Sequence, residues 1–337
     1  MKSRSTVSRA AMFVLMLLGS VAFAQPVVLK FASFEPPQAT FTAKVFQAWA
    51  DDVSKASNGT LKIEIFAGGT LGRNPLQQFK LVQDGVADIA WAVAGYTPGR
   101  FDDTEVAELP FLVNSAFEGS VVLTRLAARN ELVGFADLKL LLIGAVPPVS
   151  IHGTFPIRSL ADLKGKRLRT GSGLNGKVVT AMGGVPVLIG APQTTEAISK
   201  GVVDGALAEW NFVDTFKVHE VAFNHMALPL GGTAIMVPMM KERFDKLPPA
   251  ARAAIDKYSG EAFARRFAAI ADATITSVPA ALAKRGKNTI VVPDATTRDA
   301  FRTAVQPVVT EWRKEKPRNE RVFKSFVAEL ERLRAAK

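Results

Sequence analysis

The residues best able to do chemistry are gathered in one glycine-rich stretch, RLRTGSGLNGKV, at residues 167–178. From Gly171 this stretch matches GxGxxG, the pattern of a dinucleotide-binding turn, and it also matches GxxxxGK, most of a Walker phosphate loop. In both patterns, backbone N–H groups at the start of a helix hold a phosphate. The stretch therefore raises two possibilities, a nucleotide site or a site for another anion.

The surrounding residues argue against a nucleotide. A dinucleotide fold places its turn after an apolar, buried first strand, whereas KRLRT carries three basic residues and lies in mid-chain. Glu196 follows at about the right distance, but it stands at a predicted helix start, where an acid stabilises the helix. Val178 lacks the hydroxyl that a Walker loop offers to magnesium. We expect no nucleotide and no other cofactor.

Two arginines beside the glycines point instead to a carboxylate. Arg167 and Arg169 alternate along a predicted strand, so their side chains leave the same face. A guanidinium binds a carboxylate through two parallel hydrogen bonds. On alternation alone, two solvated surface charges remain the alternative.

The elements that must position these residues form two α/β lobes. Strand-like and helix-like segments alternate from residue 27 to 146, which is typical of a mostly parallel sheet with helices around it. One of these helices should begin near residue 40 and end at Asn58 and Gly59. A second unit begins near residue 150, with predicted strands at 150–155, 166–170, 202–208 and 225–230.

The last third of the sequence is mainly helical. From residue 249 to about 286 the apolar spacing predicts helix, long enough to run along both lobes. Pro279 should kink or divide it. A short strand at 288–292 and two helices separated near Pro317 follow.

The N-terminus carries the pattern of an export signal. Lys2, Arg4 and Arg9 precede an apolar run that ends in small residues, which predicts a secretory signal peptide at residues 1–24. The run is shorter than the roughly 20 residues of a spanning helix. We therefore expect cleavage, no stable membrane insertion and a periplasmic mature chain.

Composition excludes several classes of site. The chain has no cysteine, so thiol catalysis, disulfides and cysteine-ligated zinc are ruled out. Neither GxSxG nor HExxH occurs, and His219 and His225 have no acidic partner in a zinc motif. We assign no catalytic residue and no metal. The net charge of +11 is dispersed over amphipathic segments, which favours solvated faces over a nucleic-acid surface.

Longer stretches resemble a known family. FPIRSLADLKGKRLRTGSG, at residues 155–173, is similar to the kPI-sL-DLKG-KiR segment of substrate-binding proteins from tripartite ATP-independent periplasmic (TRAP) transporters, the DctP-like family. Five further stretches resemble that family in the same order: FAGGTLG, LVQDGVADIAWAVAGYTPGRF, ELPFL, ISKGVVDGALAEW and FDKLPPAARAAIDK. Together they span nearly the whole mature chain.

The resemblance implies a two-lobed periplasmic-binding-protein fold, type II-like, in which each lobe is a mostly parallel sheet flanked by helices and a long helix spans both. We expect lobe I at residues 25–149 and 232–278, and lobe II at residues 150–231 and 279–337. In that family the Arg of the KiR element grips the ligand's carboxylate, and the matching position is Arg169. The resemblance also implies delivery of the ligand to a TRAP membrane permease driven by an ion gradient.

Other ligand contacts follow from strand ends and from departures from the family pattern. Tyr96 lies in AGYTPG, a loop at a strand end of the kind where α/β proteins bind ligands, and Phe34 and Glu35 end the first strand. DGALAEWNF replaces the DGQENP of the sialic-acid and dicarboxylate binders, and Trp210 matches a subgroup in which this aromatic lines the cleft. The full expected set is Arg169, Trp210, Tyr96, His152, Phe34, Asn211, Phe212 and Glu35.

These expectations describe a receptor for a small monocarboxylate with an aromatic or apolar body, or for a 2-oxo acid. His152 stands where many family members have a second Arg, which disfavours a second carboxylate or a sugar acid. We expect Trp91 to pack in the core and Glu209 to be solvated. Two alternatives stay open: an exported enzyme acting on a small carboxylate, and a sensory receptor on the same fold.

Overall fold

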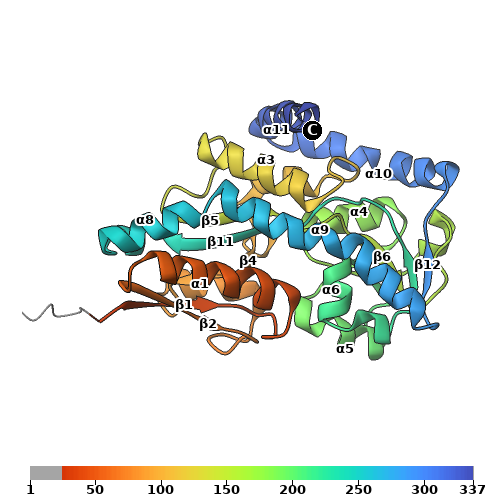
Figure 1. The fold of residues 1–337 in the computed structure, drawn as a ribbon. Coiled ribbons are helices and arrows are strands. Elements are labelled where there is room, and N and C mark those ends of the chain that lie inside the picture. Colours follow the sequence, from red (N-terminus) through yellow and green to blue (C-terminus); the bar gives the residue numbers. More distant parts are fainter. Residues whose placement is uncertain (1–24, 337) are drawn as a thin grey trace, which may run out of the picture.

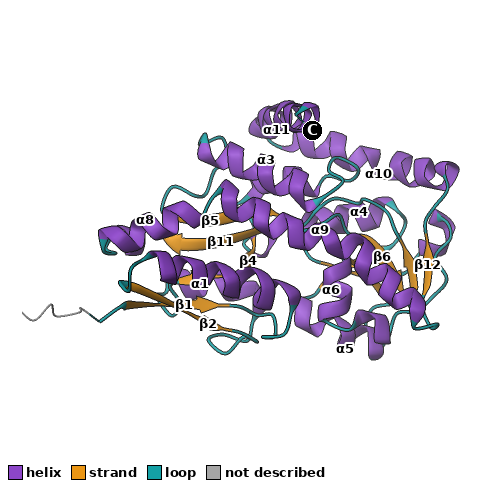
Figure 2. Ribbon diagram, in the orientation of Figure 1, coloured by secondary structure: helices purple, strands orange, loops and turns teal. Residues whose placement is uncertain are grey.

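The structure is a computed structural model that describes residues 25–336. The predicted signal peptide, residues 1–24, lies outside the described residues. Two sheets of six strands each lie next to one another, with helices packed around them (Figure 1, Figure 2). This is the two-lobed α/β architecture that the sequence predicts.

The first sheet is built mainly from the N-terminal part of the chain. Its order is β2-β1-β3-β11-β4, and β5 pairs with β11 along the whole length of that strand. The strands are β1 (Val27–Ala32), β2 (Leu61–Phe66), β3 (Ile89–Ala90), β4 (Ala92–Val93), β5 (Leu138–Ala145) and β11 (Ala234–Met240). β1 runs parallel to β2 and β3, whereas β11 is antiparallel to β3, β4 and β5.

The second sheet has the order β12-β10-β6-β9-β7-β8. The strands are β6 (Ser150–Gly153), β7 (Arg167–Thr170), β8 (Val185–Leu188), β9 (Gly205–Ala208), β10 (Asn224–Met226) and β12 (Thr289–Val291). β6 is antiparallel to β9 and β10, while β7 is parallel to β8 and β9. Five strands of each sheet run in one direction, and only β11 and β6 run the opposite way. Each sheet is therefore mostly parallel, as expected, with one antiparallel strand inside it. The sequence analysis did not predict β8.

The helices cover the sheets and connect their strands. The α-helices are α1 (Gln47–Ala56), α2 (Gln78–Gln83), α3 (Ala116–Ala128), α4 (Gly173–Ala181), α5 (Thr194–Ser199), α6 (Trp210–Thr215), α7 (Lys241–Asp245), α8 (Pro249–Tyr258), α9 (Glu261–Lys284), α10 (Ala295–Glu315) and α11 (Pro317–Ala335). A π-helical segment, Phe41–Phe46, leads into α1. Short 3₁₀ segments lie at Pro75–Gln77, Ala94–Tyr96, Asp102–Glu108, Leu160–Leu163, Ala191–Gln193 and Val218–Glu220.

The predicted long helix is found, with its break in a different place. α9 packs on α3 and β5 of the first lobe and on α6 and β12 of the second, so it spans both lobes (Figure 1). Pro279 lies inside α9 and does not divide it. The break falls at Gly260, whose φ of 65° is left-handed and suits glycine.

The two C-terminal helices lie along one side of the molecule, near α3 and α4 (Figure 1). α10 packs on α4, and α11 packs on α3 of the first lobe. We expected residues 279–337 to belong to lobe II, and α11 also packs on a helix of the first lobe. The boundaries of the lobes stay a prediction.

Within residues 25–336, no helix combines the length and the apolar character that crossing a bilayer requires.

Candidate ligand-binding site

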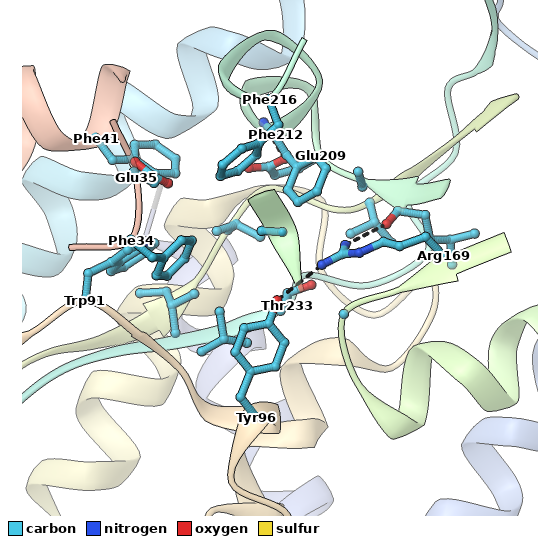
Figure 3. A pocket seen from close by; sticks show the side chains of 18 residues that line it. Phe34, Glu35, Phe41, Trp91, Tyr96, Arg169, Glu209, Phe212, Phe216 and Thr233 are labelled. Atoms are coloured by element: carbon cyan, nitrogen blue, oxygen red, sulfur yellow. Dashed lines mark hydrogen bonds between the residues drawn. The ribbon is translucent and has the colours of Figure 1, made fainter. Parts of the chain in front are cut away.

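A pocket lies where the carboxyl ends of strands from both sheets meet, the usual place for a ligand in an α/β protein. The first sheet contributes Phe34 after β1, Trp91 between β3 and β4, and Tyr96 after β4. The second contributes Arg169 from β7 and residues 207–209 at the end of β9. About 510 Å³ of empty space lies inside, part of it open to solvent. Figure 3 shows the 18 lining side chains, most of them apolar.

Arg169 is the single cation of this lining, and it is only 4 % exposed. Its Nε donates to the carbonyl oxygen of Ile189 at 2.9 Å, and Nη1 donates to that of Leu207 at 3.4 Å. Nη2 donates to the Tyr96 hydroxyl at 3.2 Å. None of the salt bridges formed by residues 25–336 includes Arg169. A buried cation without a carboxylate partner is costly, so the pocket is suited to an anion.

The remaining donors of Arg169 suit a carboxylate. A guanidinium has five N–H donors. The three hydrogen bonds described above leave one N–H on Nη1 and one on Nη2, the pair that binds both oxygens of a carboxylate. Burial lowers the pKa of Arg169, against the opposing effects of Tyr96 and Glu209, but an arginine in this setting stays charged.

Arg167, two residues earlier on the same strand, is an exposed surface charge. It pairs with Asp204, whose Oδ1 lies 2.8 Å from Nη2 of Arg167. The two alternating arginines of β7 therefore have different surroundings, and only Arg169 lines the pocket.

Glu35 and Glu209 bring two buried carboxyl groups to the pocket. Burial, with a smaller contribution from Glu209, raises the pKa of Glu35 to about 8. Burial also raises the pKa of Glu209 to about 7, although the N–H of Phe212 and the charge of Arg169 lower it. At neutral pH most Glu35 is therefore protonated, so the pocket does not repel an anion as two ionised carboxylates would.

Glu209 differs from its expected solvated state, because it is 5 % exposed. Its Oε2 accepts from the backbone N–H of Phe212 at 2.8 Å, which caps the start of α6. The residues preferred at an N-cap are Ser, Thr, Asp, Asn and Gly, so a glutamate gives little signal of this role in the sequence.

Aromatic rings form much of the wall. Phe34 and Trp91 stack with centroids 6.4 Å apart, and Phe41 meets Trp91 edge-on at 5.9 Å. Phe212 lies under the Arg169 guanidinium, 4.6 Å from Cζ to the ring centroid, a favourable cation–π contact. Trp91 packs in the core as expected and also lines the pocket. The pocket is also lined by Phe41, Phe216 and Thr233, which the sequence analysis did not indicate.

Three of the expected contacts do not line this pocket. His152 lies on β6, fully buried, with its Nδ1 2.8 Å from Nδ1 of His225 and its Nε2 3.0 Å from the Ala208 carbonyl oxygen. Trp210 packs edge-on against His152 at 4.9 Å and lines a separate hollow near Pro279. Asn211, beside Glu209, is buried outside the lining. Of the expected set, the structure brings together Arg169, Tyr96, Phe34, Glu35 and Phe212.

The glycine-rich stretch was expected to bind an anion, and two of its side chains instead bond the carboxyl group of Glu108. Ser172 caps α4 by accepting from the N–H of Asn175. The Glu108 carboxyl group accepts from the Ser172 hydroxyl and from Asn175 Nδ2, and also from the backbone N–H of Ala234 on β11. Burial raises the pKa of Glu108 to about 7. A carboxyl group of the protein therefore lies beside the start of α4 and bonds two of its side chains.

Gly171 has a different use, since it lines the pocket beside Arg169. A Cβ at this position would lie 3.4 Å from Nη1 and 3.5 Å from Nη2 of Arg169. The missing side chain therefore leaves the end of the guanidinium uncovered.

Among the described residues, no group of three or more His, Asp or Glu side chains could hold a metal ion.

Comparison with known proteins identifies a family and several solved relatives. Residues 31–315 match DctP, the bacterial extracellular solute-binding protein family 7. A TRAP solute-binding protein from a marine metagenome, specific for aromatic acids and solved with 3-hydroxybenzoate, is 30 % identical, with 92 % of this chain and 99 % of that one covered and a TM-score of 0.86. One from Rhodoferax ferrireducens T118, solved with copurified benzoate, is 29 % identical, with 92 % and 100 % covered and a TM-score of 0.87. The Comamonas testosteroni protein TsaT, named an outer membrane transporter protein, is 26 % identical, with 94 % and 93 % covered.

Proposed function

Because this chain belongs to the DctP family of bacterial extracellular solute-binding proteins and is a TRAP substrate-binding protein, we propose that it captures an aromatic monocarboxylate between its two lobes. The carboxylate binds the two free N–H groups of Arg169. The ring lies against Phe34, Trp91 and Phe212. The chain is a receptor and transforms nothing.

The observation that carries the proposal is the Arg169 guanidinium, buried in the pocket without a salt bridge. A single cation with one pair of free donors matches one carboxylate. A dicarboxylate would leave its second charge among aromatic rings and beside Glu35 and Glu209, an arrangement that desolvation and like charge disfavour.

The aromatic body is supported by the wall of the pocket and by the relatives. Flat rings of Phe34, Trp91 and Phe212 offer stacking and edge contacts to an aromatic ligand. The solved receptors from the marine metagenome and from Rhodoferax ferrireducens T118 carry 3-hydroxybenzoate and benzoate, and each is close to 30 % identical to this chain.

The receptor works with a partner in the membrane. TRAP binding proteins hand their ligand to TRAP permease subunits, and we extend this role to the present chain, in the periplasm. Closure of two lobes on the ligand gives the permease a shape to recognise.

Isothermal titration of the purified protein tests the ligand class. Benzoate is compared with benzamide, which has the same shape without the charge, and with pyruvate and succinate. We expect benzoate to bind about 100-fold more tightly than benzamide, because an ion-paired carboxylate contributes about 1.5–3 kcal/mol and the unmet Arg169 adds to the difference. Equal affinity for benzamide would refute the Arg169 clamp. Tighter binding of pyruvate or succinate would refute the aromatic class.

A further inference from the structure

Two polar groups in the pocket lining have no hydrogen-bond partner among the described residues. They are Oε2 of Glu35 and the indole Nε1 of Trp91. Both residues are almost fully buried, with 4 % and 2 % of their surfaces exposed. The two groups are neighbours, since the indole N–H lowers the pKa of the Glu35 carboxyl, yet the pair does not meet hydrogen-bond geometry.

Buried polar groups are almost always paired, so these two call for an explanation. Glu209, the other carboxyl group of the pocket, shows the usual state, since it caps α6 through the N–H of Phe212. Arg169 is likewise held by three protein oxygens. Only at Glu35 and Trp91 are an acceptor and a donor left unmet side by side on the lining.

The chemistry of the two groups selects the ligand group that would meet them. The indole N–H needs an acceptor, and the Glu35 oxygen needs a donor when it is a carboxylate or a carbonyl oxygen. A hydroxyl supplies both. An ether oxygen only accepts, and an aromatic amine is a donor with little acceptor strength. A hydroxyl also meets Glu35 in its protonated form, which burial favours at neutral pH.

Glu35 lies where the end of the ligand opposite its carboxylate would be. Figure 3 shows Glu35 near Phe41 and Phe34, on the opposite side of the pocket from Arg169. A ligand whose carboxylate meets Arg169 therefore directs the far side of its ring toward Glu35. A hydroxyl adjacent to the carboxylate would stay at the Arg169 end, so positions 3 and 4 of the ring are the relevant ones.

We propose that Glu35 and Trp91 form a second polar subsite that binds a ring hydroxyl, so that the preferred ligand is an aromatic monocarboxylate hydroxylated away from its carboxylate. This inference rests on the proposed function, since it assumes that Arg169 holds the carboxylate. It makes Glu35 and Trp91 the residues that determine specificity among aromatic acids.

Titration calorimetry with a matched set of ligands tests the subsite. The ligands are benzoate, 3-hydroxybenzoate, 4-hydroxybenzoate and, as partial mimics, 3-methoxybenzoate and 3-aminobenzoate. The proteins are the wild type, Glu35→Leu, Trp91→Phe and the control Glu196→Leu, which changes an exposed glutamate that pairs with Lys200 on α5. Thermal unfolding of each variant establishes that it is folded.

For the wild type we expect at least one of the two hydroxybenzoates to bind about 10-fold more tightly than benzoate, and more tightly than the methoxy and amino analogues. In Glu35→Leu this preference should fall to about twofold or less, and in Trp91→Phe it should fall in part. Glu196→Leu should keep the wild-type preference. If Glu35→Leu does not fold, Trp91→Phe and the wild-type ranking of the five ligands carry the test.

The contrary outcomes are distinct. If benzoate binds as tightly as both hydroxybenzoates, the subsite is refuted while the proposed function stands. A hydroxyl preference that survives both Glu35→Leu and Trp91→Phe refutes the assignment to these residues. If none of the aromatic acids binds, both the proposed function and this inference fail.

Discussion

Arg169 of the second sheet and Tyr96 of the first are joined across the pocket by a hydrogen bond of 3.2 Å from Nη2 to the phenol oxygen. The cation that we assign to the ligand's carboxylate thus also connects the two lobes. Because Tyr96 takes one N–H of Nη2, the other can bind the ligand at the same time. In the proposed function, Arg169 therefore serves both ligand binding and lobe closure.

Arg169→Lys should weaken binding of benzoate by about 10- to 100-fold, because the lysine keeps the charge but loses the planar pair of donors. Arg167→Lys is the matched control, since it lies on the same strand but pairs with Asp204 at the surface. Titration calorimetry measures both. Similar affinities for the two variants would show that Arg169 does not hold the carboxylate.

Gly171→Ala should reduce affinity by about 10-fold with little change in the melting temperature. The new Cβ would lie 3.4 Å from Nη1 of Arg169, on the side where the carboxylate is expected. The backbone at Gly171 is not in the left-handed region, so alanine brings no strain there. Calorimetry and thermal unfolding separate the two effects, and unchanged affinity would place the carboxylate elsewhere.

Phe212→Leu should mainly weaken ligand binding, whereas Trp210→Leu should mainly lower stability, although the two residues are close together on α6. Phe212 lines the pocket under Arg169, so its loss should raise the dissociation constant for benzoate by about 5- to 10-fold. Trp210 packs against His152 outside the pocket, so its loss should lower the free energy of unfolding by about 2–4 kcal/mol and change affinity less than twofold. Urea unfolding and calorimetry measure the pair. A large affinity loss in Trp210→Leu would return Trp210 to the site.

Glu35→Gln should change the pH dependence of stability. Burial raises the Glu35 pKa from 4.5 to about 8, so between these values the folded protein holds a proton that the unfolded chain has lost. Folding then becomes less favourable as pH rises, by about 1.4 kcal/mol per pH unit from this group. Glutamine does not ionise, so the variant's free energy of unfolding should fall less steeply from about pH 5 to pH 8. Urea unfolding at several pH values gives the slopes, and parallel slopes would contradict the raised pKa.

The sequence could predict most of the fold because local signals were strong. Alternating strands, helix stops at Asn58 and Gly59, and the division near Pro317 are all found close to their expected places. The position of β11 in the first sheet could not be predicted from local sequence patterns. Its antiparallel pairing with β3, β4 and β5 depends on contacts more than 80 residues away in the chain.

The site was partly predictable for the same reason. Strand ends indicated Phe34, Glu35 and Tyr96, and the resemblance to a family indicated Arg169; all four line the pocket. Trp210 and Phe212 could not be separated, since the sequence does not give the rotation of α6. The contact of His152 with His225 could not be predicted, because only the pairing of β6 with β10 brings the two residues together.

Glu108 connects the two lobes outside the pocket. It accepts from Ser172 and Asn175 at the start of α4 and from Ala234 on β11, and none of these four residues lines the pocket. This attachment does not need the ligand. We therefore expect the lobes to separate at the Arg169 side when the ligand leaves, while the Glu108 hydrogen bonds still hold them together.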